Sequence, residues 1–303
     1  MVVLRNGETE KVQSGKTVVA LGSFDALHKG HTQLIEKARD MARERGLTSL
    51  VQLFRIPPGG YNEKGEFECV NSLEKRLEIL EKMGIDGVVL EEFDESFRKT
   101  DYKTFVKTFI AEKYNASAVC AGYNYRFGYM AKGDTDLLRE ECGKLGIDVF
   151  VQDCVRLDMA VSSSVIRDMV RCGDVVRAAE YLGRPFSLCG EVVRGRQLGR
   201  QMGFPTANIN LPEGIVIPRE GVYKTNACID DKRYVCITNV GHKPTVNKAE
   251  QNCETHIIGF DGDLYGKNIE IEFENRIRDI VEFGNIEELK TQLEQDMKKV
   301  TEN

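Results

Sequence analysis

The sequence has few of the features that would place it in a membrane, in the secretory pathway or on nucleic acid. No apolar run approaches the roughly 20 residues that cross a bilayer, and the first residues lack the basic start and long apolar core of a signal peptide. The formal net charge is −6, with acidic and basic residues mixed, whereas a general nucleic-acid binder carries a basic surface. We therefore expect neither a membrane nor a nucleic-acid partner.

Cysteine pairs are also missing. The nine cysteines are an odd number, and no two of them stand in a C-x-x-C pair. Their scatter indicates neither a disulfide framework nor a structural zinc site. Reduced thiols are typical of the cytosol, so we expect a cytoplasmic protein. At 303 residues, with 41% hydrophobic and 30% charged residues, the chain fits two ordinary globular domains.

Histidine is scarce, yet two of the four histidines share one turn, at positions 28 and 31. The β-branched run at residues 17–21 before them predicts a buried strand, and apolar residues at helical spacing after His31 predict a helix. Backbone N–H groups at a helix N-terminus favour phosphate, and two imidazoles there could stabilise developing charge. Gly30 would allow the close approach of a nucleotide. The alternative is a pair of surface polar residues.

Strands and helices alternate through the first half of the chain. Further strands are predicted at residues 49–54, 87–90, 117–121 and 147–151. This alternation is typical of a parallel α/β sheet, in which ligands bind at the carboxyl ends of strands. Between the strands, residues 102–114 predict an amphipathic helix. The acidic run at residues 91–95 predicts a solvated loop.

Two more loops fall at predicted strand ends. Residues 122–129 combine aromatic side chains with Asn124 and Arg126, which suits a planar ring beside a phosphate. Residues 161–167 offer hydroxyls at a helix start with Arg167 one turn in, which suits an anion. Each loop also has a plain interpretation, as an aromatic loop packed on its domain and as a helix cap with a surface arginine.

The pattern changes after Arg184-Pro185. Short β-type runs now follow one another at residues 188–193, 221–229, 234–240, 254–260 and 268–275. Closely spaced strands without helices between them predict a small antiparallel barrel, and residues 286–300 predict a final amphipathic helix. We therefore expect two domains, at residues 1–185 and 186–303.

The second domain has two clusters of polar chemistry. A loop rich in glycine and arginine at residues 195–208 suits phosphates, and Thr206 and Asn208 in it carry oxygen atoms that suit Mg²⁺. Glu254 could accept a proton from a hydroxyl nucleophile. On composition alone, a mobile basic loop and an exposed strand carboxylate are the favoured interpretation.

The string GSFDALHKGH at residues 22–31 resembles the signature of the nucleotidylyltransferase superfamily, which has a Rossmann-like parallel sheet and transfers a nucleoside monophosphate. With the loops at 122–129 and 161–167, in that order, the first domain is similar to bacterial-type FAD synthetases. The resemblance implies that His28 and His31 contact a triphosphate. It also implies nucleotide-binding roles for Gly22, Phe24, Asp25, Ser163, Ser164 and Arg167, and flavin-binding roles for Asn124, Arg126 and Phe127.

The second domain closely resembles riboflavin kinase, through GRQMGFPTAN at residues 199–208, ETH at 254–256 and DGDLYGK at 261–267. The resemblance implies that Thr206 and Asn208 bind Mg²⁺ and the nucleotide. It implies that Glu254 activates the ribityl 5′-hydroxyl of riboflavin. Gly195 and Arg200 would contact the nucleotide, and Arg276 would lie near the flavin.

Together the two resemblances imply a bifunctional riboflavin kinase/FMN adenylyltransferase, with riboflavin, FMN and ATP as substrates, FAD as product and Mg²⁺ as cofactor. The sequence leaves the oligomeric state open. One alternative is a riboflavin kinase whose first domain only binds nucleotide. It is favoured by the absence of the histidine in Phe-Arg-Ile-Pro-Pro at residues 54–58, where the family usually has Phe-x-Pro-His-Pro. It is opposed by the intact motifs at residues 28–31, 126–128 and 162–167. The other alternative is a flavin-sensing regulator without turnover. Such a regulator would need a segment that binds DNA or a partner, and the sequence has neither a helix-turn-helix addition nor a basic tail.

Overall fold

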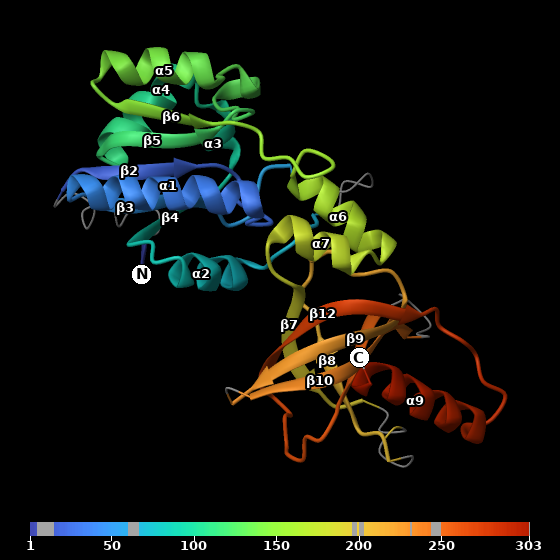
Figure 1. Cartoon of the computed structure of the whole chain (residues 1–303). Coiled ribbons are helices and arrows are strands. Elements are labelled where there is room, and N and C mark those ends of the chain that lie inside the picture. Colours follow the sequence, from blue (N-terminus) through green and yellow to red (C-terminus); the bar gives the residue numbers. More distant parts are fainter. Residues whose placement is uncertain are drawn as a thin grey trace. The chain divides into compact units, whose positions relative to one another are not determined.

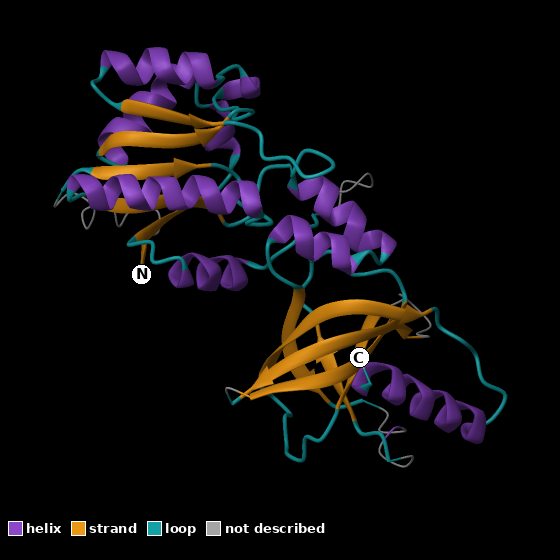
Figure 2. Cartoon of the chain, in the orientation of Figure 1, coloured by secondary structure: helices purple, strands orange, loops and turns teal. Residues whose placement is uncertain are grey.

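The computed structural model describes residues 1–4, 15–59, 67–195, 199, 203–230, 232–243 and 250–302. The chain divides into two compact units, Met1–Ser163 and Ser164–Asn303. Figure 1 labels their helices and strands, and Figure 2 shows that the first unit alternates strands with helices whereas the second is built mainly of strands.

The first unit contains a six-stranded sheet in the order β1-β4-β3-β2-β5-β6, and every neighbouring pair is parallel. The strands are β1 (Val2–Leu4), β2 (Thr17–Leu21), β3 (Thr48–Phe54), β4 (Gly87–Glu91), β5 (Ala116–Gly122) and β6 (Asp148–Gln152). After β2 the chain adds β3 and β4 on one side and then returns to place β5 on the other side. The strand order therefore reverses between β2 and β5, which is the position where such sheets bind ligands.

Helices cover both faces of this sheet. They are α1 (Lys29–Arg45), α2 (Leu73–Lys82), α3 (Glu95–Lys99), α4 (Tyr102–Thr104), η2 (Phe105–Lys113), η3 (Tyr129–Ala131) and α5 (Thr135–Lys144). Side chains alternate along β2, so Val18 and Ala20 pack in a core with α1 and α2. Val19 and Leu21 pack in a second core with η2 and α5. The predicted parallel α/β architecture is confirmed.

The acidic run at residues 91–95 is a solvated loop only in part: residues 92–94 are exposed and lie outside helix and strand, whereas at Glu91 the prediction is wrong. Glu91 ends β4 and is 1% exposed. Its carboxylate accepts a hydrogen bond from the Tyr114 hydroxyl at 2.9 Å and pairs with Lys113 Nζ at 2.7 Å. Asp94 caps α3, since its side chain accepts from the N–H of Phe97. The carboxylates of this run therefore hold local structure.

The helix predicted at residues 102–114 is present, but most of it is a π-helix, which has more residues per turn than an α-helix. Only its first residues form the α-helical α4, and the following residues form the π-helix η2. At its end the N–H of Tyr114 donates to the carbonyl of Phe109, five residues back, at 2.8 Å. The Tyr114 ring and hydroxyl are thereby placed in the buried group with Glu91.

The second unit contains a closed barrel in the order β10-β11-β8-β7-β12-β9, in which every pair is antiparallel. Its elements are α6 (Ser163–Cys172), α7 (Val175–Leu182), β7 (Phe186–Val193), β8 (Thr206–Asn210), β9 (Gly221–Ile229), β10 (Lys232–Lys243), β11 (Glu250–Ile257), β12 (Asn268–Arg278) and α9 (Ile286–Thr301). The predicted barrel with a C-terminal helix is confirmed.

Three threonines show which side chains point into the barrel. Thr225, Thr238 and Thr255 are fully buried, and their hydroxyls form a chain with separations of 2.7 and 2.9 Å. Because side chains alternate along a strand, the neighbours of Thr238 and Thr255 lie on the outer face. On that face α9 covers β9 and β10, where its Val300 packs with Val222 and Ile237.

The helices α6 and α7 belong largely to the second unit. The N–H of Arg219 donates to the carbonyl of Val170 in α6 at 3.3 Å, and α7 contacts β7 and β12. The division of the chain into compact units therefore falls at residues 163 and 164. The boundary near residue 185 assigns these helices to the first domain and stays a prediction.

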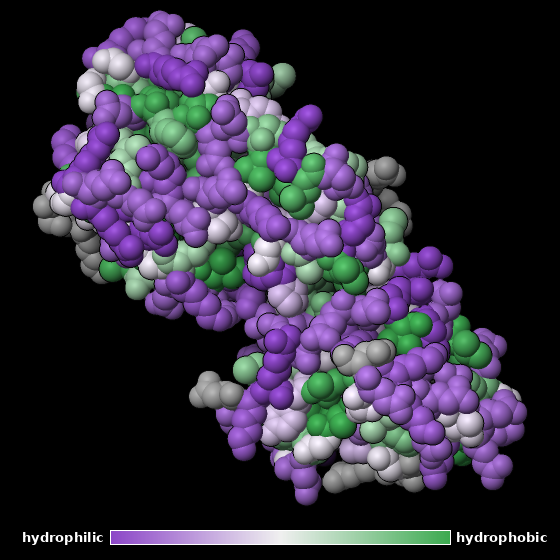
Figure 3. All heavy atoms as spheres, viewed as in Figure 1, coloured by the Kyte–Doolittle hydropathy of each residue, from purple (hydrophilic) through white to green (hydrophobic). Residues whose placement is uncertain are grey.

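The described part of the chain contains no helix with the length and apolar character of a membrane span. On the face drawn in Figure 3, hydrophobic residues form small separate groups among hydrophilic ones.

The pairing of α9 with the barrel predicts a large stability effect. Asp296 is fully buried, and its carboxylate accepts from Arg278 Nε at 2.9 Å and Nη2 at 2.8 Å. We expect Asp296→Ala to lower the free energy of opening of the barrel by about 3 kcal/mol, because the half-buried arginine loses its fully buried partner. Hydrogen exchange of β9 and β10 peptides measures this. Glu294→Ala, at an exposed position of α9, is the control, and equal exchange in both variants would contradict the prediction.

The burial of the cysteines predicts which thiols react at a given pH. Burial raises the pKa of the Cys120, Cys142, Cys236 and Cys253 thiols to about 12, whereas Cys172 and Cys228 are exposed. The thiolate is the reactive form. At pH 9 the pH is still about three units below the pKa of these four thiols, so they remain protonated. We expect iodoacetamide to label Cys172 and Cys228 in the folded chain and to leave the four buried thiols unlabelled up to pH 9. Peptide mass spectrometry locates the label. Labelling of Cys253 as fast as Cys228 would contradict this, and unfolded protein is the control.

Candidate functional site

The first helix begins at the pair of histidines. Nδ1 of His28 accepts the backbone N–H of His31 at 3.2 Å, which makes His28 the N-cap of α1. Since Nδ1 is the acceptor, a neutral His28 ring carries its proton on Nε2. The two imidazoles stack with centroids 3.7 Å apart, and the edge of His31 meets Phe24 at 5.0 Å. Two ring N–H donors therefore stand together at a helix N-terminus, where an anion is favoured.

The turn before His28 is strained and firmly held. Phe24 and Leu27 are fully buried, and both have a φ of +46°, which non-glycine residues rarely adopt. The buried carboxylate of Asp25 accepts from the N–H of Val70 at 2.7 Å. Nδ2 of Asn71 donates to the carbonyls of Asp25 and Ala26 at 2.9 and 2.8 Å. Such strain persists only where the surroundings fix it, so residues 70–71 set the position of the histidines.

Gln152 joins three loops at the carboxyl edge of the sheet. Its Nε2 donates to the carbonyl of Gly30 at 3.3 Å, and its backbone carbonyl accepts from the N–H of Tyr123 at 2.8 Å. The loops after β2, β5 and β6 therefore meet where the strand order reverses. The structure brings the predicted loop at residues 122–129 to the same edge as His28.

Within that loop the three predicted flavin-binding residues differ. Asn124 and Arg126 are exposed, and Arg126 pairs with Asp134 at 3.4 Å. Phe127 is buried in the core beside Phe105, with ring centroids 5.3 Å apart. Contact of all three with flavin stays a prediction, and the packing of Phe127 gives it a supporting role.

The other predicted nucleotide-binding residues of this domain are placed as follows. Gly22 lies against the Phe24 ring, where a Cβ would come within 2.8 Å of Cζ. Phe24 and Asp25 are buried in the turn. Ser163 and Ser164 begin α6, and Arg167, which is 7% exposed, donates through Nη2 to Ser164 Oγ at 3.2 Å. The roles of all of them at a nucleotide stay predictions.

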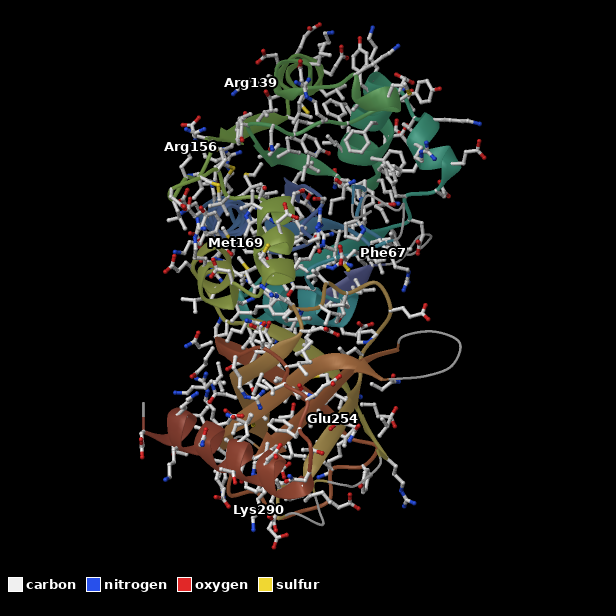
Figure 4. All side chains as sticks on the ribbon, turned by 90° about the vertical axis from the view of Figure 1, so that its right-hand side faces the viewer. Phe67, Arg139, Arg156, Met169, Glu254 and Lys290 are labelled. Atoms are coloured by element: carbon white, nitrogen blue, oxygen red, sulfur yellow. The ribbon has the colours of Figure 1, made fainter. Side chains whose placement is uncertain are left out.

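In the second unit, strand pairing assembles the predicted kinase residues. Asn208 on β8 lies directly opposite Glu254 on β11, and Thr206 lies opposite His256. Thr255 faces the interior, so these four side chains share the outer face of the barrel. Figure 4 shows Glu254 on its barrel strand. Half-buried Glu254 therefore lies on the same face of the barrel as residues 206 and 208.

Asn208 has the character of a ligand side chain. It is 6% exposed, and its Oδ1 atom has no hydrogen-bond partner within the described part of the chain. Gly195 packs on its amide so closely that a Cβ at residue 195 would lie 2.3 Å from Nδ2. A buried acceptor without a partner is costly, and a bound cation would satisfy it. The Asn208 oxygen with the Thr206 hydroxyl fits the hard oxygen ligands that Mg²⁺ prefers.

His256 supports the same strand end. Its Nδ1 lies 2.8 Å from the carbonyl of Pro205, and its ring meets Phe204 at 5.5 Å. Because a carbonyl only accepts, Nδ1 carries the proton. His256 therefore fixes the residue before Thr206. Arg200, which the sequence predicts at the nucleotide, lies outside the described residues.

Arg276 is held on the barrel by several groups. Its Nη2 donates to the carbonyl of Glu220 at 2.6 Å and to Asp279 Oδ1 at 2.5 Å. The hydrogen bond from Arg276 holds the pKa of the exposed Asp279 carboxyl below its usual range. Gly173, between α6 and α7, packs on Arg276, where a Cβ would lie 2.9 Å from Cδ. Contact of Arg276 with flavin stays a prediction.

Two family models cover most of the chain. The model described as "FAD synthetase" matches residues 10–165, and the model described as "Riboflavin kinase" matches residues 182–303. A bifunctional riboflavin kinase/FMN adenylyltransferase of Bacillus subtilis is 33% identical over 292 residues, covering 94% of this chain and 92% of that protein. The chain belongs to the bifunctional riboflavin kinase/FMN adenylyltransferase family. The family member from Escherichia coli K12 is 30% identical over 282 residues, covering 92% of this chain and 90% of that protein.

One solved structure resembles the whole chain. A crystal structure described as a macrolide-efflux protein of Streptococcus pneumoniae has a TM-score of 0.89 and 29% identity, covering 100% of this chain and 99% of that chain. The likeness extends through both units of this member of the riboflavin kinase/FMN adenylyltransferase family.

Some residues of these sites are not evident from the sequence. Asn71, Gln152 and His256 each hold a functional segment through contacts with residues distant in the chain. No local pattern in the sequence marks these contacts, since each joins segments far apart in the chain.

The contacts of Asn71 predict a test of the histidine turn. We expect Asn71→Ala to lower the free energy of unfolding of the first unit by about 2 kcal/mol, because two buried carbonyls lose their donor. Hydrogen exchange of peptides around residues 24–31 measures it. Asn124→Ala removes an exposed amide from the same unit and is the matched control. Unchanged exchange in Asn71→Ala would show that other contacts hold the turn.

Proposed function

We propose that this chain phosphorylates riboflavin to FMN with ATP and then transfers AMP from a second ATP to FMN, giving FAD and pyrophosphate. The observation that carries the proposal is the presence of both family domains in one chain, each with its polar groups assembled. This combination favours the bifunctional enzyme over a riboflavin kinase with a silent first domain. A cytoplasmic location is part of the proposal.

In the kinase step, the Glu254 carboxylate accepts the proton of the ribityl 5′-hydroxyl while that oxygen forms a bond to the γ-phosphorus of ATP. The bond from this phosphorus to the bridging oxygen breaks, and ADP leaves. Thr206 and Asn208 would hold Mg²⁺, which neutralises phosphate charge when bound. The placement of Glu254 opposite Asn208 supports this assignment.

In the adenylyl step, the FMN phosphate attacks the α-phosphorus of ATP, and pyrophosphate leaves. This phosphate is already an ionised nucleophile, so the protein's contribution is placement and charge stabilisation. His28 and His31 donate ring N–H groups to the triphosphate. The capped and stacked arrangement of the two rings supports that role, because it fixes both donors at the helix N-terminus.

Separate losses of the two steps test the proposal. With riboflavin, ATP and Mg²⁺ we expect FMN and then FAD, resolved by chromatography over time. His28→Ala should abolish FAD and leave FMN formation intact, whereas Glu254→Gln should lower FMN formation at least 100-fold and still convert added FMN to FAD. Omission of Mg²⁺ is the control for the metal.

The outcomes separate the competing functions. FMN without FAD, even when FMN and ATP are supplied, would reduce the first unit to a binding module. No conversion in the wild-type chain would contradict the enzyme and favour a flavin sensor. Loss of both steps in Glu254→Gln would point to a folding defect.

A further inference from the structure

Arg76 on α2 is a buried charge that neither proposed reaction step uses. Its side chain is among the largest that are fully buried, and the residue is 1% exposed. Nη1 donates to the carbonyl of Phe54 and Nη2 to the carbonyl of Arg55, each at 2.7 Å. Burial lowers the pKa of the guanidinium, and the nearby Cys69 and Asp25 act in the opposite direction. Because an arginine stays charged in proteins, the fold accepts the cost of a buried cation at this place.

The two carbonyls lie where the chain leaves the sheet. Phe54 is the last residue of β3, and Arg55 is the first residue beyond it. Successive carbonyls of an extended strand point in opposite directions, so one guanidinium reaches both only where the chain bends. The planar fork of arginine suits such a pair of acceptors, whereas the ammonium of lysine is a compact point charge. Arg76 therefore fixes the bend after β3 relative to α2.

The segment just before α2 holds the histidine turn. The N–H of Val70 donates to the carboxylate of Asp25, and Nδ2 of Asn71 donates to the carbonyls of Asp25 and Ala26. Residues 70–76 therefore act as one brace. The turn after β2 is held at one end of it, and the bend after β3 is held at the other.

The structure assigns Arg76 as a positioning residue of the adenylyl step. Its two hydrogen bonds fix the start of α2 at the end of β3, and from that place Val70 and Asn71 hold the turn that carries His28 and His31. This rests on the proposed role of the two histidines at the triphosphate. Arg76 acts through the turn and transfers no group itself.

The expected effect follows from what the histidines do. Donors that stabilise developing charge must lie at hydrogen-bond distance from it, and a displacement of about 1 Å can cost about 100-fold in rate. A shift of the turn therefore lowers kcat of the adenylyl step more than it changes the KM for ATP. FMN formation, which the proposed function gives to the second unit, is unaffected.

The experiment measures conversion of FMN and ATP to FAD by the full chain. We expect Arg76→Lys, which keeps the charge but not the two-carbonyl geometry, to lower kcat about 30-fold with the KM for ATP within about twofold of wild type. Arg76→Met should lower kcat at least as much. Arg139→Met, at an exposed position of α5, is the matched control and should keep the wild-type rate. FMN formation from riboflavin should stay intact in all three variants.

A spectroscopic measurement separates positioning from a simple loss of folded protein. The chain has four histidines, two in the turn and two, His242 and His256, in the second unit. In ¹⁵N-histidine NMR spectra we expect Arg76→Lys to shift the ring signals of His28 and His31 in the folded protein and to leave the other two in place. A variant that only lost folded protein would keep the wild-type ring signals at reduced intensity, and that result would overturn the inference.

The outcomes distinguish this inference from the proposed function. Full FAD formation by His28→Ala would overturn the role of the histidines themselves. If His28→Ala is inactive while Arg76→Lys keeps the wild-type kcat, the positioning role is wrong. A raised KM for ATP with kcat unchanged would place Arg76 at the nucleotide and would also overturn it.

Discussion

The hydrogen bond from the N–H of His31 to Nδ1 of His28 sets the start of α1 and, with it, the functional edge of the first unit. The bond determines which nitrogen of a neutral His28 carries the proton, and the stacking of the rings places the second histidine beside the first. Both effects need a backbone turn that Phe24 and Leu27 adopt only at a conformational cost. Asp25 and Asn71 maintain that turn, so the placement of the two rings depends on hydrogen bonds made by other residues.

The second unit meets a comparable demand with strand register. In that unit the predicted kinase residues lie on neighbouring antiparallel strands, and the pairing of the strands sets Asn208 opposite Glu254. A shift of one residue would turn Glu254 inward and Thr255 outward. The buried threonine hydroxyls oppose such a shift, because each would lose its partner in the apolar interior.

Local patterns in the sequence were sufficient for most of the elements, though not for β1 and β8, and for the residues whose chemistry is unusual. The histidine pair, the Thr206 and Asn208 oxygens and Glu254 stand out by type and by motif, and the structure places the last three on one face. Glu91 was misjudged because its partner Tyr114 lies on a later helix, and an acidic run gives no sign of that contact. Asn71 was not singled out for the same reason. Its importance comes from hydrogen bonds between distant segments, which composition and periodicity do not encode.

The alternation along β11 has a consequence for how this protein can change. Cys253, Thr255 and Ile257 are buried in the barrel, while Glu254 and His256 lie on its outer face. Substitutions that alter the interior packing and substitutions that alter the outer face therefore fall at interleaved positions of a single strand. A change in the lining of the barrel can be compensated by other interior side chains, while the outer face keeps the same backbone beneath it.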